Sequence, residues 1–178
     1  GFLSRQEMDA IVQATDKSTW NGHRDQVMFS TFYNTGARVS EIIALTTDDV
    51  ILGDNSYVRI RGKGRKERSV PLWKSTAKLI RGWLNRVGGT ATLCVFPNRR
   101  GQPLTRSGIE QRLRVAIGKA TAGCRSLEGK KVSVHTLRHT TAMHLLQSGV
   151  DITTIALWLG HESPSTTHTY IEANLQMK

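Results

Sequence analysis

Residues 135–170 read HTLRHTTAMHLLQSGVDITTIALWLGHESPSTTHTY and hold a dense group of chemically capable side chains. His135 and Arg138 stand three residues apart in a segment that begins as a helix, so both side chains can face the same way. A second predicted helix places its apolar residues inward, ends at a glycine and leaves His161 on the loop beyond. Tyr170 follows nine residues later. The stretch therefore has the residues of an active site.

The composition of the chain indicates its size class and the kind of partner it binds. The chain has 178 residues, 38% of them hydrophobic, which suits one compact domain. Its formal net charge of +11 makes nucleic acid the first partner to consider. A membrane is disfavoured, because the basic residues are dispersed, no apolar run approaches the roughly 18 residues of a spanning helix, and no signal peptide is visible. Cys94 and Cys124 lack the spacing of a zinc or disulfide framework, which fits a cytoplasmic protein.

Patterns along the rest of the chain predict mainly helices. A capping box opens the first helix at Ser4, and apolar spacing predicts further helices over residues 23–33, 75–86 and 106–119. Residues 50–72 alternate on both sides of the glycine-bracketed turn GKGRK, which indicates antiparallel strands. The predicted fold class is therefore α+β, mainly α-helical with a small antiparallel β-sheet.

Two basic residues outside residues 135–170 lie at the ends of predicted elements. Arg38, in TGARVSE, precedes a short helix that would bring it near Glu41, and Lys63 lies in the hairpin turn GKGRKER. Both also fit plain structural roles, Arg38 as a surface or helix-capping residue and Lys63 at a solvated hairpin tip. Glu41 fits either an orienting partner for Arg38 or a helix-surface ion pair.

Together these residues suit the cleavage of a phosphodiester by a tyrosine. A phenol with a pKa of about 10 must lose its proton, and negative charge must be stabilised on two non-bridging oxygens. Arg38 and Arg138 can clamp such a phosphate, because the planar guanidinium matches its geometry. Lys63 can protonate the leaving 5′ oxygen, while His135 and His161 can donate hydrogen bonds or accept the phenol proton.

The same residues stand in the order of the conserved boxes of the tyrosine recombinases, also called the phage integrase family. TGARVSE resembles the first arginine box, GKGRKER the lysine box, HTLRH the second arginine box and LGH the histidine that follows it. The resemblance covers the chain from the first of these boxes to Tyr170. It implies six catalytic residues: Arg38, Lys63, His135, Arg138, His161 and Tyr170.

The resemblance implies a metal-independent DNA strand transferase that acts in site-specific recombination or DNA integration. Tyr170 would form a 3′-phosphotyrosyl link and release a 5′ hydroxyl that later attacks the link on another strand. No cofactor is implied, which agrees with the lack of a GxxxxGK[ST] loop in the sequence. The whole chain, 1–178, would be the catalytic domain, without the family's amino-terminal core-binding domain. Double-stranded DNA is the implied partner, with a tetramer on DNA for the full-length protein and a monomer for the isolated domain.

Further basic residues are expected to contact DNA phosphates, which position a protein without selecting sequence. These residues are Arg65, Lys66, Arg68, Arg99, Arg100 and Arg106.

Other functions remain open. The two helices around Gly149 superficially fit a helix-turn-helix, which would make a non-catalytic DNA-binding module but leaves Arg38 and Lys63 without a role. A type IB topoisomerase that relaxes DNA shares the tyrosine chemistry. A metal site is disfavoured, because no H-E-x-x-H spacing is present and an arginine next to the histidines would repel a cation. His139 and His144 are expected to cap or pack within their helix, His168 to face solvent, and Trp83 and Trp158 to pack in the core.

Overall fold

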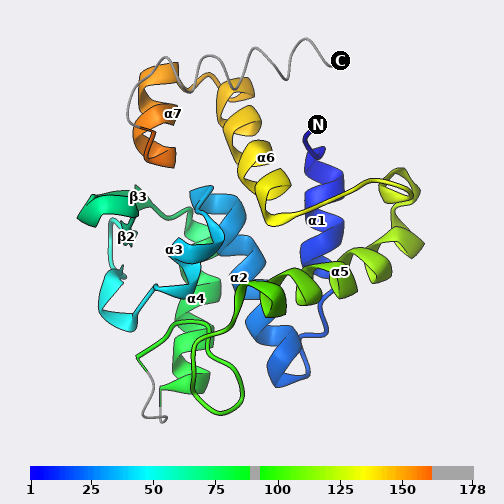
Figure 1. Cartoon of the computed structure of the whole chain (residues 1–178), viewed down its shortest axis with the longest axis horizontal. Helices are drawn as coiled ribbons and strands as arrows, with labels where there is room; N and C mark the ends of the chain where they lie inside the picture. The colour runs from blue at the N-terminus through cyan, green and yellow to red at the C-terminus, as the bar shows by residue number, and fades with distance from the viewer. Residues whose placement is uncertain (89–92, 162–178) are drawn as a thin grey trace.

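The computed structural model describes residues 1–88 and 93–161 (Figure 1). Its α-helices are α1 (Arg5–Gln13), α2 (Trp20–Thr35), α3 (Val39–Ile43), α4 (Lys74–Val87), α5 (Arg106–Gly123), α6 (Val134–Gln147) and α7 (Ile152–Leu159). The strands are β1 (Val50–Ile51), β2 (Tyr57–Arg61) and β3 (Glu67–Pro71), and short 3₁₀ turns cover η1 (Thr47–Asp49), η2 (Lys63–Arg65) and η3 (Arg125–Leu127). The predicted α+β class, mainly helical with a small antiparallel sheet, is confirmed.

Helix ends follow the local signals in the sequence. The capping box at α1 is present: Ser4 Oγ accepts the Glu7 N–H at 3.0 Å, and Glu7 Oε1 accepts the Ser4 N–H at 2.9 Å. α2 and α7 each end at a glycine in the left-handed region, with φ of 64° at Gly36 and 74° at Gly160. α2 begins earlier than predicted because Thr19 Oγ1 caps it by accepting the Gly22 N–H.

The strands form one antiparallel sheet in the order β1-β2-β3. In the β2–β3 hairpin, Val58 lies opposite Val70 and Ile60 lies opposite Arg68. Val58, Ile60 and Val70 are buried, so one face of the hairpin packs on the helical core. Because side chains alternate along a strand, Arg68 shares the inward side with Val70.

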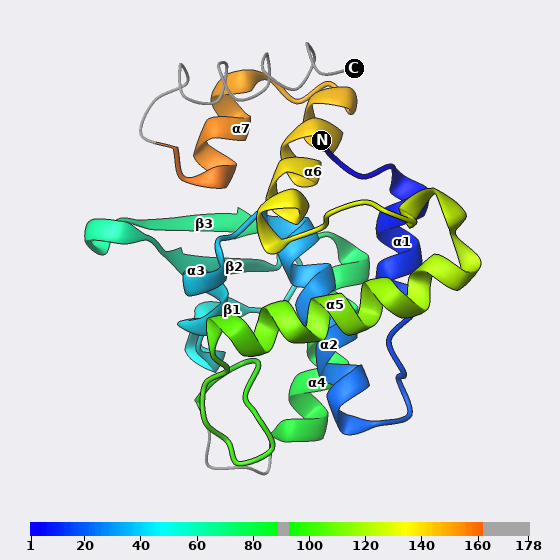
Figure 2. The ribbon, with the colours of Figure 1, turned by 45° about the vertical axis from the view of Figure 1, so that its right-hand side comes forward.

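α2 is the centre of the helical core. It packs against α1, α4 and α6, with α5 crossing in front of it in Figure 2, and buries Val27, Phe29 and Phe32. Trp83 of α4 is fully buried with its Nε1–H on the Val95 carbonyl, as predicted for a core residue. Trp158 of α7 is half-buried, and its Nε1–H bonds to the Asn34 carbonyl. No helix within residues 1–88 or 93–161 has the length and apolar character that a membrane span requires.

Candidate active site

Four of the six predicted catalytic residues line one pocket of about 530 Å³. The pocket lies where the first turns of α3, α5 and α6 meet the loop that follows α7. The residues that bring charge or hydrogen-bonding groups to it include Arg38, Arg106, Ser133, His135, Arg138 and His161. The chain thus gathers at one place side chains that lie more than a hundred residues apart in the sequence.

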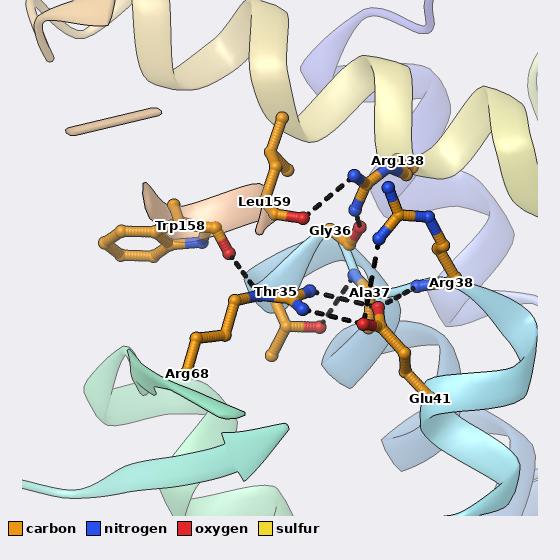
Figure 3. Close-up of polar contacts among 9 residues, drawn as sticks. All are labelled: Thr35, Gly36, Ala37, Arg38, Glu41, Arg68, Arg138, Trp158 and Leu159. Carbon is orange, nitrogen blue, oxygen red and sulfur yellow. Dashed lines mark hydrogen bonds and ion pairs between the residues drawn. The ribbon is translucent and has the colours of Figure 1, made fainter. Parts of the chain in front are cut away.

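Arg138 is the most firmly held of these side chains. It lies on α6 and is only 5% exposed. Its Nη1 donates to the Gly36 carbonyl at 2.6 Å and its Nη2 to the Leu159 carbonyl at 2.8 Å (Figure 3). These acceptors are backbone groups at the carboxyl ends of α2 and α7, where the helix dipole favours a cation. The guanidinium is therefore fixed in place at the pocket before any ligand arrives.

Arg38 is held by its backbone and leaves its side chain half-exposed. It is the N-cap of α3, and its N–H donates to Glu41 Oε1 at 2.8 Å. Its side chain is 48% exposed, and its Nη1 lies 3.8 Å from Glu41 Oε2. The prediction that Arg38 and Glu41 lie near each other is confirmed. Arg38 lines the pocket, and its half-exposed guanidinium can be reached by an incoming anion.

The two predicted histidines differ in environment. His135 is exposed in the first turn of α6, one turn before Arg138. His161 is half-buried beyond Gly160, and its N–H donates to the Ala156 carbonyl. Burial, together with the positive charges of Arg138, Arg38 and Arg68, lowers the pKa of His161 to about 4. His161 is therefore a neutral imidazole at pH 7, able to donate one hydrogen bond and accept another.

Lys63 and Tyr170 stand apart from this group. Lys63 is exposed in η2 at the tip of the β2–β3 hairpin, as predicted, and is not among the described residues that line the pocket. Tyr170 lies outside the described residues.

The expectation that Arg68 contacts phosphate disagrees with its surroundings. Its side chain is only 12% exposed, and Nη1 and Nη2 donate to the two carboxylate oxygens of Glu41 at 2.7 and 3.0 Å (Figure 3). Its Nε donates to the Trp158 carbonyl at 2.9 Å. Arg68 is therefore a mostly buried cation and the main partner of Glu41. The alternation of β3, which puts Arg68 on the side of Val70, was the sequence signal for this.

Four of the other predicted phosphate contacts are exposed: Lys66, Arg99, Arg100 and Arg106. Arg65 and Lys66 belong to the hairpin turn, and Lys66 is exposed. Arg99 and Arg100 are exposed in the turn after Pro97, with the Arg99 guanidinium 5.1 Å from the Trp20 ring. Arg106 begins α5 at the pocket and lies 3.6 Å from Glu110, which also lines it. Glu110 was not singled out in the sequence, since only the fold brings it there.

The remaining histidines of α6 pack as expected. His144 is buried, with Nε2 on the Leu3 carbonyl and Nδ1 on the Tyr33 hydroxyl. His139 is half-buried, with its pKa lowered to about 4 mainly by burial. Within the described part of the chain, no three His, Cys, Asp or Glu side chains are grouped to hold a metal ion. His168 lies outside the described residues.

Comparison with known proteins identifies relatives of the whole chain. A model of the phage integrase family matches residues 1–177. A putative integrase/recombinase of Sinorhizobium fredii is 48% identical over 177 residues, which are 99% of this chain and 53% of that protein. The XerD tyrosine recombinase of Staphylococcus haemolyticus is 35% identical over 94% of this chain and 56% of its own length. The chain therefore spans about half the length of the curated relatives it matches.

Solved structures share the fold. The XerA recombinase matches with a TM-score of 0.82 and 30% identity over 96% of this chain and 57% of that one. The XerH site-specific recombinase, in a pre-cleavage complex with its difH substrate, matches with a TM-score of 0.81 and 26% identity over 95% of this chain and 49% of its own. The predicted likeness in fold is confirmed.

Proposed function

Because the chain belongs to the phage integrase family, we propose that it is the catalytic domain of a site-specific DNA recombinase or integrase. The reaction is the cleavage and rejoining of DNA strands through a 3′-phosphotyrosyl intermediate, without a metal ion. Double-stranded DNA is the substrate, and the full-length protein assembles as a tetramer on it. The relatives are about twice as long as this chain, so these are properties of a longer protein to which this domain contributes the chemistry.

One observation supports this function above the others: two arginines at one pocket are held in different ways. Arg138 is fixed by two carbonyls, while Arg38 is anchored by its backbone and keeps a half-exposed guanidinium. Two guanidinium groups at one pocket suit the two non-bridging oxygens of a phosphodiester, whose negative charge grows in the transition state. Because Arg138 needs no rearrangement, its stabilising effect is preorganised.

The reaction has two halves, cleavage and rejoining. The Tyr170 oxygen attacks the phosphorus, a Tyr–O–P bond forms, and the bond from phosphorus to the 5′ oxygen breaks. The phenol proton passes to a base, for which His135 is a better candidate than His161, because the lowered pKa of His161 makes its ring a weak base. Lys63 supplies a proton to the departing 5′ oxygen. His161 suits hydrogen bonding to the phosphate, since its low pKa keeps one ring nitrogen as an acceptor and the other as a donor. In the second half of the cycle, a 5′ hydroxyl attacks the phosphotyrosine and releases Tyr170.

Lys63 must approach the phosphate for this scheme. Its hairpin is held by the β2–β3 ladder, and near the turn by the hydrogen bonds of Arg68 to Glu41, while the tip with Lys63 is exposed. The positive charge of the hairpin tip attracts it to the phosphates of bound DNA. The exposed Lys66 in the same turn adds to this charge.

The test uses a DNA pool because the target sequence is unknown. The chain is incubated, in excess chelator, with nicked duplexes whose central positions are randomised, and covalent adducts are separated on denaturing gels. The proposal expects an adduct that Tyr170→Phe abolishes while DNA binding is retained. Arg38→Ala and Arg138→Ala should each slow its formation about a hundredfold or more. A non-catalytic helix-turn-helix module would bind DNA and give no adduct.

A further inference from the structure

Arg68 joins three elements of the candidate active site through every nitrogen of its guanidinium. From β3, it donates two hydrogen bonds to Glu41 on α3 and one to the Trp158 carbonyl at the end of α7 (Figure 3). These elements carry or adjoin three predicted catalytic residues: Lys63 in the hairpin turn, Arg38 at the start of α3, and His161 after α7.

The end of α7 is shaped around this guanidinium. A Cβ added at Gly160 would lie 2.6 Å from Arg68 Nη1, closer than real contacts allow. The same glycine has a φ of 74°, which an L side chain rarely adopts. Glycine therefore permits both the turn toward His161 and the close approach of Arg68.

Glu41 connects Arg68 to Arg38, because its carboxylate interacts with both arginines. Its side chain is only 3% exposed. Burial alone would raise the pKa of Glu41. The hydrogen bonds from Arg68 and from the Arg38 N–H, together with the positive charges of both arginines, more than offset burial and lower the pKa. A buried carboxylate needs a cation, and the nearest alternative is the Arg38 guanidinium, 3.8 Å away and beyond hydrogen-bond reach.

We propose that Arg68 is a positioning residue, which occupies both oxygens of Glu41 and so leaves the Arg38 guanidinium available to the scissile phosphate. This rests on the proposed function, since it assigns Arg38 to the phosphate. Without Arg68, the Glu41 carboxylate captures the Arg38 side chain as a hydrogen-bonded ion pair. Arg68 acts through Glu41 and does not touch DNA.

The test compares Arg68→Ala with the double variant Arg68→Ala/Glu41→Gln. Glutamine keeps an oxygen that accepts the Arg38 N–H, but it carries no charge to capture the guanidinium. The substrate is a nicked duplex recovered from the randomised pool, at a concentration that saturates each variant. Arg68→Ala should slow adduct formation about tenfold or more, and Glu41→Gln should recover most of that loss. The DNA affinity of both variants and its dependence on salt should match those of the unmodified chain.

Two outcomes of these affinity and rate measurements would overturn the inference. A fall in DNA affinity and in its salt dependence for Arg68→Ala, with no recovery in the double variant, would make Arg68 a direct phosphate contact. An equally slow double variant with normal affinity would limit Arg68 to a packing role. If Arg68→Ala folds poorly, Arg68→Lys replaces it. Lysine retains the charge but cannot make all three hydrogen bonds, so adduct formation should be slower than in the unmodified chain, by less than the roughly tenfold loss expected of Arg68→Ala.

A crystallographic measurement separates this inference from the proposed function, because it needs no DNA. In Arg68→Ala, or in the equally neutral Arg68→Met if that variant alone crystallises, the Arg38 Nη1 to Glu41 Oε2 distance should shorten from 3.8 Å into the hydrogen-bonding range. An unchanged distance refutes the capture of Arg38, whatever the activity of the chain. An unmodified chain that forms no adduct refutes the proposed function, and this distance still decides the role of Arg68.

Discussion

Arg138→Ala should slow the chemistry, and it should also destabilise the fold, because Arg138 holds two helix ends together. The substitution removes two hydrogen bonds from a charged, 5% exposed donor to the Gly36 and Leu159 carbonyls. Hydrogen bonds to charged groups contribute roughly 1.5–3 kcal/mol each, and water entering from the pocket can satisfy part of the freed carbonyls. We therefore expect the free energy of unfolding to fall by about 3 kcal/mol.

Urea unfolding followed by tryptophan fluorescence measures this change, and two variants bracket it. Arg138→Lys keeps the charge but lacks the planar fork that lets arginine reach both carbonyls. The free energy of unfolding should therefore fall by about half as much. Arg100→Ala removes an exposed arginine and should stay within about 0.5 kcal/mol of the unmodified chain. If Arg138→Ala is as stable as Arg100→Ala, the guanidinium does not hold the ends of α2 and α7, and the preorganisation assigned to it is refuted.

Three further predictions concern single residues. If Lys63 protonates the departing oxygen, Lys63→Ala should be slow on normal DNA and close to the unmodified chain on a 5′-phosphorothiolate substrate, because a thiol with a pKa of about 8.5 needs no proton to leave. Lys66→Ala should be only mildly impaired on both substrates, and rescue of Lys66→Ala in place of Lys63→Ala would move the acid to Lys66. The pKa of His161, lowered to about 4 from 6.5, means that the unfolded chain binds its proton more readily than the native state. Its contribution to stability is therefore constant above about pH 6.5 and is lost as the pH falls from there toward 4, by at most about 3 kcal/mol. The free energy of unfolding should decrease less between pH 7 and pH 4.5 in His161→Asn than in the unmodified chain. An equal decrease in both chains would contradict the lowered pKa of His161. Gly160→Ala should cost about 1–2 kcal/mol, because it places a side chain at positive φ against Arg68; a neutral effect in thermal unfolding would show that Arg68 moves aside freely.

Local chemistry explains how much of the fold could be predicted. Gly36 and Gly160 end helices where predicted, and Ser4 begins one, because capping signals act within a few residues. The hairpin with Lys63 at its tip was likewise visible as a change of period around two glycines. These features depend on neighbours in the sequence, so no tertiary information is required.

The contacts that assemble the site could not be predicted in the same way. Arg138 donates to carbonyls 102 residues before it and 21 residues after it, and any residue type supplies such an acceptor. The pairing of Arg68 with Glu41 was not predicted, because the sequence pointed only to Arg38, at a spacing of three residues, as the partner of Glu41. The alternation along β3 indicated that Arg68 faces inward, but its partner depends on how the hairpin packs on α3.

The most direct test of the central claim identifies the tyrosine and the DNA end that become linked. The chain contains three tyrosines, Tyr33, Tyr57 and Tyr170. Tyr33 is a poor nucleophile because burial raises its pKa, and Tyr57 lies in β2. The covalent adduct is digested with protease, its DNA-bearing peptide is identified by mass spectrometry, and the released DNA end is tested for direct labelling by polynucleotide kinase. The account predicts phosphate-linked DNA on Tyr170 and a free 5′ hydroxyl on the released strand. Attachment at Tyr33 or Tyr57, a 5′-phosphotyrosyl link, or no adduct would contradict it.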